Sequence, residues 1–436
     1  MKTFQKDRPC VVIVGGGFGG LWAARTLARV PVHVVVVDRN NYHTFFPLLY
    51  QVAAAELEPE EITYPVRGIL RKMPNAQFAM AEVTEIDFEK QVIKTDGPAF
   101  PYDFLILATG STTHFFGVPG AAERAFPLRT MDQAIALRNH ILHCFERAVQ
   151  ERNSERRNRL LTFTIVGGGA TGVEFAGALA ELIYRPLRRD YPTLDFQEVR
   201  VVLLEAAGNL LPTFPEKFRE YARTRLGKKG IKVRLQAVVT RVAPDSVYLE
   251  DGEVIPTETV VWTAGVRGDP CAEVSGLPTA RNGRITVLPT LQVPNYANVY
   301  VIGDLAYLEE EGYPIPMVAP VAIQQGVRAA KNILRQLVGE PLRPFHYRDR
   351  GMMATIGRNA AVAHLLNRWA FTGFPAWLLW MGLHLFYLIG FRNRLFVMVN
   401  WAWDYFFYER TVKLILPRPS SIASPSPSPP ESKGSP

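Results

Sequence analysis

The stretch Val11-Val12-Ile13-Val14-Gly15-Gly16-Gly17-Phe18-Gly19-Gly20 decides the fold, because a β-branched strand runs directly into a GxGxxG turn. A helix rich in alanine is predicted over Leu21 to Val30, and a second strand over Val32 to Asp38 ends in an acid. Strand, helix and strand in parallel form a right-handed crossover unit. In such a unit the glycines let a pyrophosphate approach the helix N-terminus, and the acid accepts hydrogen bonds from a ribose diol.

The same pattern returns at Phe163-Thr164-Ile165-Val166-Gly167-Gly168-Gly169-Ala170-Thr171-Gly172. A helix is predicted next over Val173 to Tyr184, and a strand over Val199 to Glu205. One GxGxxG alone is a weak signal, because glycine-rich turns also serve packing. Two copies in the correct frame predict two dinucleotide sites. The predicted fold class is therefore α/β, with two doubly wound, Rossmann-like domains and a C-terminal membrane-attachment region.

Which nucleotide each fold binds follows from the later turns. Ala108-Thr109-Gly110 and Gly303-Asp304 both follow apolar strands, and both are needed to wrap a long cofactor in one groove. We expect the Asp304 carboxylate to bond the ribityl hydroxyls, so that the first fold binds FAD. In the second fold Glu205 is followed by small residues, with no Arg or Lys for a 2′-phosphate. An acid at this position favours NADH over NADPH.

The domain organisation follows from these assignments. We predict a discontinuous FAD-binding domain at 8–125 and 290–350, with an NADH-binding domain inserted at 126–289. A membrane-anchoring region is predicted at 351–416, and a Pro/Ser tail at 417–436. This tail contains seven Pro and seven Ser in its 20 residues and is expected to be disordered.

Charge is concentrated towards the C-terminus. Residues 343–418 hold ten Lys/Arg and three Asp/Glu, which accounts for seven of the net charge of +8. Their neighbours are Trp, Phe and Leu, so an anionic membrane surface is the expected partner, and nucleic acid is not. The three cysteines are far apart in the sequence, which excludes a disulfide framework and a zinc ribbon. No metal-ligand cluster is predicted. The N-terminus does not resemble a signal peptide, so the protein is expected on the cytoplasmic side.

Two C-terminal segments suggest membrane contact. Residues 374–391 contain no Asp, Glu, Lys or Arg, and as a helix they would be about 27 Å long, near the lower limit for a membrane span. Whether they span the membrane or lie in its surface stays open. Residues 395–416 form an aromatic amphipathic pattern, in which Asn400, Asp404 and Thr411 share one face. We expect four aromatic side chains of this segment at headgroup level: Trp401, Trp403, Tyr405 and Tyr408.

The sequence resembles the type II NADH dehydrogenases, the single-polypeptide, non-proton-pumping NADH:quinone oxidoreductases of respiratory membranes. The resemblance covers about residues 8–416. Besides both glycine motifs, it rests on Asn41 to Ala53 (NYHTFFPLLYQVA), Thr171 to Gly177 (TGVEFAG), Thr263-Ala264-Gly265 and Val301 to Asp304. It implies hydride transfer from NADH to FAD, two-electron reduction of a membrane quinone without proton pumping, and a homodimer. It also implies attachment through C-terminal helices to the cytoplasmic face of an inner, plasma or thylakoid-type membrane.

Site residues carry over position by position. For FAD the motifs and the resemblance together indicate Gly15, Gly17, Phe18, Gly19, Gly20, Asp38, Arg39, Val83, Ala108, Thr109, Gly110, Asp304, Val321 and Ala322. For NADH they indicate Gly167, Gly169, Thr171, Gly172, Glu205, Ala264 and Gly265. Glu174 and Gln324 are the candidate catalytic residues, and Ala319, Pro320 and Gln325 are expected on the quinone side. Many members of the family have Ala-Gln where this chain has Ala319-Pro320.

Alternatives stay open at this stage. Glu174 lies in the first turn of a predicted helix, where a carboxylate is favoured by the helix dipole without any catalytic role. Gln324 and Gln325 could equally be polar residues of a helix surface. The whole protein could instead reduce a small electron-carrier protein, although the apolar C-terminus argues against this. It could also be a flavoprotein redox sensor or scaffold.

Overall fold

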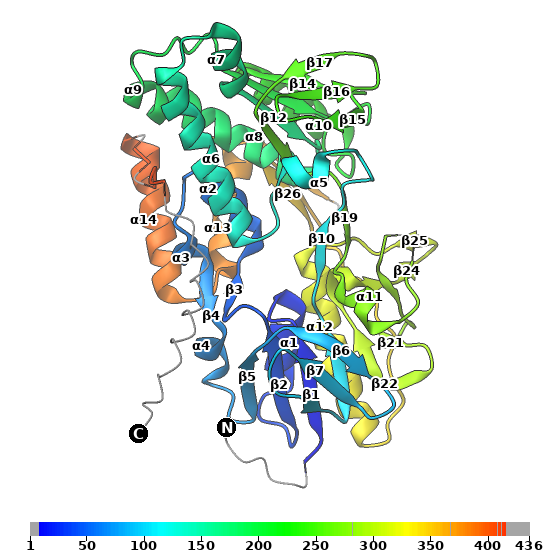
Figure 1. Ribbon diagram of the computed structural model, residues 1–436. Coiled ribbons are helices and arrows are strands. Elements are labelled where there is room, and N and C mark those ends of the chain that lie inside the picture. Colours follow the sequence, from blue (N-terminus) through cyan, green and yellow to red (C-terminus); the bar gives the residue numbers. More distant parts are fainter. Residues whose placement is uncertain (1–7, 281, 367, 408, 411, 416–436) are drawn as a thin grey trace, which may run out of the picture.

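The computed structural model describes residues 8–280, 282–366, 368–407, 409–410 and 412–415. It consists of two halves, each built on a parallel sheet, and the C-terminal helices lie along one side (Figure 1). The predicted Pro/Ser tail, with Thr411 and Tyr408, lies outside the described residues.

The first glycine motif belongs to a six-stranded sheet in the order β21-β22-β9-β1-β2-β5. All neighbouring strands are parallel except β21, which is antiparallel to β22. The central strands β1 and β9 are apolar along their whole length, as is typical of a parallel sheet covered on both faces. The strands are β1 (Cys10–Val14), β2 (His33–Asp38), β5 (Ala76–Met80), β9 (Phe104–Leu107), β21 (Gln292–Val293) and β22 (Tyr296–Val301). Helix α1 (Phe18–Thr26) follows the glycine turn and packs against α12 (Ala319–Leu337).

Short elements surround this first fold. Its small helices are α3 (Pro59–Ile62), α4 (Val66–Leu70) and α11 (Cys271–Ser275), with 3-10 turns η1 (Phe46–Leu48) and η3 (Gly303–Leu305). The short helix α2 (Leu49–Ala53) of the same segment packs in the core of the second half. Its small sheets pair β3 (Tyr42–Thr44) with β4 (Thr63–Pro65), β6 (Val83–Asp87) with β7 (Val92–Thr95) and β8 (Phe100–Pro101), β20 (Ile285–Thr286) with β23 (Ala306–Tyr307), and β24 (Glu309–Glu310) with β25 (Tyr313–Pro314).

The second glycine motif belongs to a five-stranded parallel sheet in the order β11-β18-β12-β13-β14. The strands are β11 (Phe126–Pro127), β12 (Thr162–Val166), β13 (Arg200–Leu204), β14 (Ile231–Arg234) and β18 (Thr259–Trp262). A smaller sheet holds β15 (Val239–Val242), β16 (Ser246–Leu249) and β17 (Val254–Pro256). The helices are α5 (Ala121–Arg124), α6 (Met131–Gln150), α7 (Ser154–Leu160), α8 (Ala170–Leu182), π-helical η2 (Ile183–Leu187), α9 (Arg188–Asp190) and α10 (Glu216–Lys228).

Two antiparallel strands connect the halves. β10 (Ser111–Thr113) leads from the first fold to the second, and β19 (Val266–Gly268) leads back (Figure 1). The inserted domain at 126–289 stays a prediction. In the structure Leu277, Ile285 and Val287 pack in the core of the first fold.

The C-terminal region packs into the body of the protein. A sheet of β26 (Gly351–Thr355), β27 (Ala361–Leu365) and β28 (Trp369–Gly373) leads to α13 (Phe374–Tyr387) and α14 (Phe391–Phe407). Trp380 and Val397 are fully buried in the same core cluster as α2 and α8. The asparagine Asn393 donates to the backbone carbonyls of Glu60, Glu61 and Thr63. The described residues between 351 and 415 thus pack against both folds.

Two expectations about the C-terminal helices need correction. The charge-free run 374–391 is not one helix, because Leu388 takes an extended conformation and Gly390 a positive φ between α13 and α14. Among the described residues, no helix combines the length and apolarity needed to cross a membrane. Trp401 and Tyr405 also point inward: the Trp401 indole donates to Gln51, and Tyr405 stacks on Trp377.

Candidate functional site

The first glycine turn is built to receive a phosphate group. Gly15 has a φ of +110°, and a Cβ there would lie 2.3 Å from the Ala108 carbonyl oxygen, so no other residue fits. A Cβ on Gly17 would meet nothing within 4 Å, which leaves open space in front of the α1 N-terminus. Asp38 accepts hydrogen bonds from the Gly16 amide (2.6 Å) and the Asn40 amide (2.7 Å). Burial raises the pKa of Asp38, and the two amide bonds oppose this rise.

A second set of groups faces the same groove from β9 and β22. Gly110 has a φ of +82° with open space at its Cβ position, and the buried Thr109 Oγ1 has no hydrogen-bond partner among the described residues. Asp304 Oδ2 accepts a hydrogen bond from Ser111 Oγ at 2.6 Å and lies 3.4 Å from Arg129 Nη2. An unpaired hydroxyl, an open glycine turn and an oriented carboxylate fit the ribityl and phosphate groups of FAD.

The remaining predicted FAD residues lie around this groove. Phe18 opens α1, with its ring edge-on to His43 and Phe45. Arg39 is exposed beside Asp38, and Val83 begins β6. Val321 and Ala322 lie in the first turn of α12, where their amides donate to the Val318 carbonyl. The assignment of these residues to FAD stays a prediction.

The second glycine turn repeats the first. Gly167 has a φ of +111°, and its Cβ position would lie 2.6 Å from the Ala264 nitrogen. Glu205 accepts hydrogen bonds from the Gly168 amide at 2.5 Å and from the Ala207 amide at 2.7 Å. The Gly169 Cβ position is open, as at Gly17. These features fit a second nucleotide whose ribose would face the Glu205 carboxylate.

The other predicted NADH residues flank this turn. Gly172 lies so close to the Gly167 carbonyl oxygen that a Cβ would be 1.9 Å away, whereas Thr171 is half-buried at the start of α8. Gly265 has a φ of +69° and lies against the ring of Phe116. Thr171, Ala264 and Gly265 thus border the open space in front of α8.

α8 begins at Ala170, so Glu174 is its fifth residue and lies beyond the first turn, where the sequence had placed it. Its side chain lines a cavity of about 290 Å³. Its Oε1 accepts a hydrogen bond from the Thr355 amide at 3.1 Å. Burial raises the pKa of Glu174 to about 8, although the Thr355 amide and the nearby Trp380 indole both oppose the shift. The indole nitrogen lies near the carboxyl group without meeting hydrogen-bond geometry. Glu174 is therefore mostly protonated at neutral pH, a property that a helix-capping carboxylate would not need.

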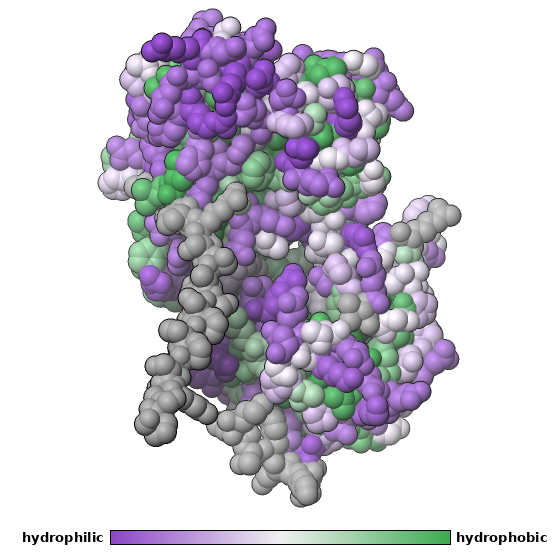
Figure 2. Space-filling view, viewed as in Figure 1, coloured by the Kyte–Doolittle hydropathy of each residue, from purple (hydrophilic) through white to green (hydrophobic). Residues whose placement is uncertain are grey.

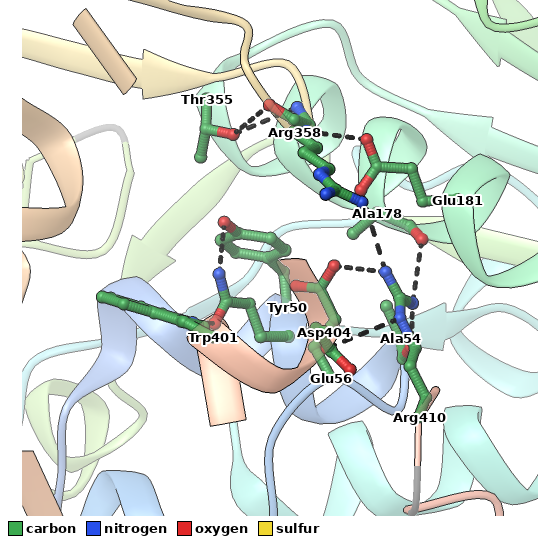
Figure 3. Close-up of polar contacts among 12 residues, drawn as sticks. Tyr50, Ala54, Glu56, Ala178, Glu181, Thr355, Arg358, Trp401, Asp404 and Arg410 are labelled. Atoms are coloured by element: carbon green, nitrogen blue, oxygen red, sulfur yellow. Dashed lines mark hydrogen bonds and ion pairs between the residues drawn. The ribbon is translucent and has the colours of Figure 1, made fainter. Parts of the chain in front are cut away.

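The far wall of this cavity carries a charged cluster, which we define as Glu56, Glu181, Arg358, Asp404 and Arg410. In Figure 3 the Arg410 guanidinium lies between the Glu56 carboxylate and the carbonyls of Ala54 and Ala178. Burial raises the pKa of Glu56 to about 7 and that of Asp404 to about 6, and Arg410 opposes both shifts. The cluster joins α2, α8 and the C-terminal segment.

The predicted quinone-side residues lie at the N-terminal part of α12. Val318 is the N-cap, followed by Ala319 and Pro320, so the missing amide hydrogen of Pro320 costs the helix little. Gln324 is bonded in both directions to the backbone of Arg348, at 3.0 and 3.1 Å. Gln325 is fully buried, and its Oε1 accepts a hydrogen bond from the Gly303 amide at 2.6 Å. Gln325 thus supports the turn that holds Asp304 and is not exposed at the helix surface.

Histidines and cysteines are accounted for by packing. Burial lowers the pKa of His43 and of His384 to about 4, and each ring nitrogen Nδ1 lies near a backbone carbonyl, that of Gly16 or Trp380. Cys10, Cys144 and Cys271 are free thiols, and burial raises the pKa of each to about 11. Within the described ranges, no three His, Cys, Asp or Glu side chains are grouped to hold a metal ion.

Sequence reasoning missed Ser111, Arg129, Thr355 and Arg410. The sequence did contain one signal near Arg129. Thr130 and Gln133 form a capping box, which marks the start of α6 directly after Arg129. The other three have no local pattern, since their partners lie far away along the chain.

Comparison with known proteins agrees with this geometry. The sequence profile of the pyridine nucleotide-disulphide oxidoreductases matches residues 9–326. A type II NADH:quinone oxidoreductase of Mycobacterium tuberculosis, Ndh, is 41% identical over 407 residues, covering 90% of this chain and 87% of that protein. A probable NADH dehydrogenase of Dictyostelium discoideum is 33% identical, covering 92% and 90% of the two chains. The solved structure of NDH2 from Plasmodium falciparum in complex with NADH has a TM-score of 0.86 at 19% identity, covering 94% of this chain and 100% of that one, and shares its fold.

Proposed function

The chain belongs to the pyridine nucleotide-disulphide oxidoreductase family and, within it, to the type II NADH:quinone oxidoreductases, and we propose that it oxidises NADH through bound FAD and reduces a quinone at a membrane surface. The observation that carries this proposal is the pair of glycine turns in one chain. Each turn places an acid on its second glycine amide and leaves open space in front of a helix N-terminus. Bound FAD would supply the chemistry that accepts a hydride and returns two electrons to a quinone.

The side chains around the two sites would hold and orient the cofactors, and one of them would supply a proton. Asp38 and Asp304 would hold the ribose and ribityl hydroxyls of FAD, and Glu205 would hold the ribose of NADH. Reduction of a quinone to a quinol by a hydride consumes one further proton. Glu174, with its pKa near 8, can hold such a proton at neutral pH in a cavity between α8 and α13.

The membrane surface is supported by α13 and α14. Many of their large apolar side chains are exposed: Phe374, Leu378, Leu379, Leu383, Phe386, Phe391, Leu395, Phe396, Met398, Val399, Trp403, Phe406 and Phe407. In Figure 2 hydrophobic surface gathers at the left edge, over the region that α14 occupies in Figure 1. Arg350, Arg392 and Arg394 lie at or beside the turn between the helices. An apolar face bordered by arginine fits the interface of an anionic bilayer.

The proposal also includes the residues beside the quinone, a homodimer, and attachment to the cytoplasmic face of the membrane. Ala319, Pro320 and Gln324 would border the quinone, with Gln324 kept in place by its bonds to Arg348. The homodimer and the cytoplasmic face rest on family membership. Light scattering of the purified protein in detergent tests the first, and protease accessibility in sealed vesicles tests the second.

Vesicle assays test the central claim. FAD-loaded protein is mixed with anionic phospholipid vesicles that contain a lipid quinone, and NADH oxidation and co-sedimentation are measured. We expect quinone-dependent NADH oxidation by vesicle-bound protein. Phe386→Glu with Phe391→Glu, which charges two aromatics that are 69% and 82% exposed, should abolish both readouts but preserve reduction of a soluble dye.

Tyr313→Glu is the matched control. Tyr313 is 78% exposed on the β24–β25 hairpin, so the same kind of substitution on another surface should change nothing. If NADH oxidation does not depend on lipid quinone but depends on an added ferredoxin-like carrier, the protein is a reductase of a small electron-carrier protein and the proposal is wrong. Slow turnover with every acceptor would favour the redox-sensor reading.

A further inference from the structure

Arg129 comes from one fold and reaches into the other. It immediately precedes Thr130, the N-cap of α6, which is the first long helix of the second fold. Its guanidinium contacts Ser111 Oγ and lies 3.4 Å from Asp304 Oδ2, and both partners belong to the first fold or to its exit strand β10. Its Cζ also lies 4.5 Å from the ring centroid of Phe46.

The three partners of Arg129 belong to, or lie next to, segments predicted to bind FAD. Ser111 directly follows the Ala108–Gly110 turn, and Asp304 lies in the Gly303 turn. Phe46 begins η1, directly after Phe45, whose ring packs against Phe18 at the α1 N-terminus. The side chain of Arg129 is therefore located between both cofactor turns, at the border of the groove.

The guanidinium keeps donors for a further partner. Its interactions with oxygen acceptors all run through Nη2, and no described residue accepts a hydrogen bond from its Nε or Nη1. The side chain is only 22% exposed, and burial lowers the pKa of Arg129 while Asp304 opposes the shift. An arginine nevertheless stays protonated in proteins, so a fixed positive charge borders the groove. A buried cation with one carboxylate at 3.4 Å is incompletely compensated.

We propose that Arg129 binds FAD and raises the reduction potential of the bound cofactor. The proposal rests on the function proposed above, because it requires FAD in the first fold. Reduction places additional negative charge on the cofactor, and a fixed cation at hydrogen-bond range stabilises this charge more than it stabilises the oxidised form. The Ser111 hydroxyl and the face of Phe46 position the guanidinium for this role.

The test measures the midpoint potential of bound FAD by spectroelectrochemical titration, together with FAD content and the unfolding temperature of the holoenzyme. We expect Arg129→Met to lower the potential by about 30 mV, which corresponds to a tenfold loss in the preference for the reduced form. Arg129→Lys keeps the charge and should retain most of the potential, with weaker FAD retention because lysine offers no fork of donors. Ser111→Ala should lower the potential by a smaller amount in the same direction.

Arg157→Met is the matched control. Arg157 pairs with Glu198 at 2.8 Å and is 28% exposed, so an arginine–carboxylate pair of similar exposure is lost away from both turns. The potential of this variant should equal that of the wild type. If Arg129→Met and Ser111→Ala lose thermal stability while their bound FAD keeps the wild-type potential, Arg129 is a strut between the folds and the proposal is wrong. If Arg129→Met retains no FAD, the proposal is tested by the other two variants: the reduction potential should be mostly retained in Arg129→Lys and lowered in Ser111→Ala. Failure of the wild type to bind FAD would instead overturn the proposed function.

Discussion

The two glycine turns are nearly identical, but they differ at the fifth position of the GxGxxG motif. In both turns the second glycine amide donates to an acid, Asp38 or Glu205, and a Cβ on the last glycine would lie 1.9 Å from a carbonyl oxygen. Gly19 of the first copy corresponds to Thr171 of the second. A Cβ on Gly19 would lie 3.1 Å from Ile302 and 3.3 Å from the Ala322 carbonyl oxygen, whereas the second copy accommodates the half-buried Thr171.

The difference comes from the helix that crosses the first copy. α12 packs on α1 so closely that a Cβ on Gly326 would lie 2.3 Å from the Gly19 carbonyl oxygen. In the second copy no such constraint is placed on Thr171. The repeated glycines of the motif therefore serve the turn itself and the open space in front of the helix, and the additional glycine serves the contact with α12. The second fold can change at this position, but the first cannot.

Breaking the helix contact should have the largest effect. Gly326→Ala puts a methyl group against the α1 backbone, and we expect a loss of about 1–3 kcal/mol in the free energy of unfolding, together with reduced FAD content. Denaturant unfolding and FAD absorbance measure both. Gly227→Ala is the control, because it lies in α10 with open space around its Cβ position. It should raise stability by about 0.5–1 kcal/mol, as alanine does within a helix. Equal behaviour of the two variants would contradict the crossing argument.

Substitution of Glu205 should change the nucleotide preference without loss of the fold. Glu205 accepts two backbone amides, and its charge disfavours a 2′-phosphate. We expect the wild type to prefer NADH, and Glu205→Arg to reduce kcat/KM for NADH about tenfold while the value for NADPH rises. Glu205→Gln should narrow the preference less, because it removes the charge without adding a phosphate partner. Equal kcat/KM of the wild type with both nucleotides would sink this prediction.

Glu174 sharpens the comparison because the first copy has Trp22 at the corresponding place. A pKa raised to about 8 means that folding disfavours the charged carboxylate. The stability contribution of the neutral form is complete below about pH 4.5 and is lost as pH rises through 8. Between pH 5 and 8 the free energy of unfolding of Glu174→Gln should therefore rise relative to that of the wild type. The quinone turnover of this variant should be lower than that of the wild type. Unfolding curves at several pH values check the sign, and a constant difference would rule out the raised pKa.

The smallest effect is expected at Pro320, in the helix that only the first fold has. Pro320→Gln restores a side-chain amide at the second position of α12 without disturbing its N-cap. We expect the rate of flavin reduction by NADH to stay within a few-fold, with a change in quinone affinity or preference. Stopped-flow reduction, followed separately from reoxidation by quinone, distinguishes the two. A large loss in the first half-reaction alone would place Pro320 in the flavin fold.

Local pattern predicted both crossover units, because a strand, a glycine turn and a helix are set by residues next to each other. It also predicted that Asn400 and Asp404 share one face of a helix. Periodicity does not tell which side of an amphipathic helix meets the protein, however. In the structure Asn400 contacts Glu61 and Asp404 faces Arg410, so the polar face is turned inward and apolar residues such as Phe406 are turned outward.

Contacts between distant segments were beyond sequence reasoning. Arg129 and Asp304 are 175 positions apart, and nothing near either residue specifies the other. The same holds for Thr355, whose amide reaches Glu174 from a strand that follows the FAD fold. Burial and not spacing gives Glu174 its raised pKa, and burial depends on how α13 packs.

Arg410 and Asn393 have a thermodynamic consequence. Arg410 bonds the carbonyls that close α2 and lie within α8, and Asn393 bonds three carbonyls around α3, so the C-terminal helices and the nucleotide folds share one set of hydrogen bonds. A bilayer that binds the ordered helices acts as a ligand of the native state, and linkage is reciprocal. Vesicles should therefore raise the equilibrium affinity for FAD, and FAD should raise the affinity for vesicles by the same factor.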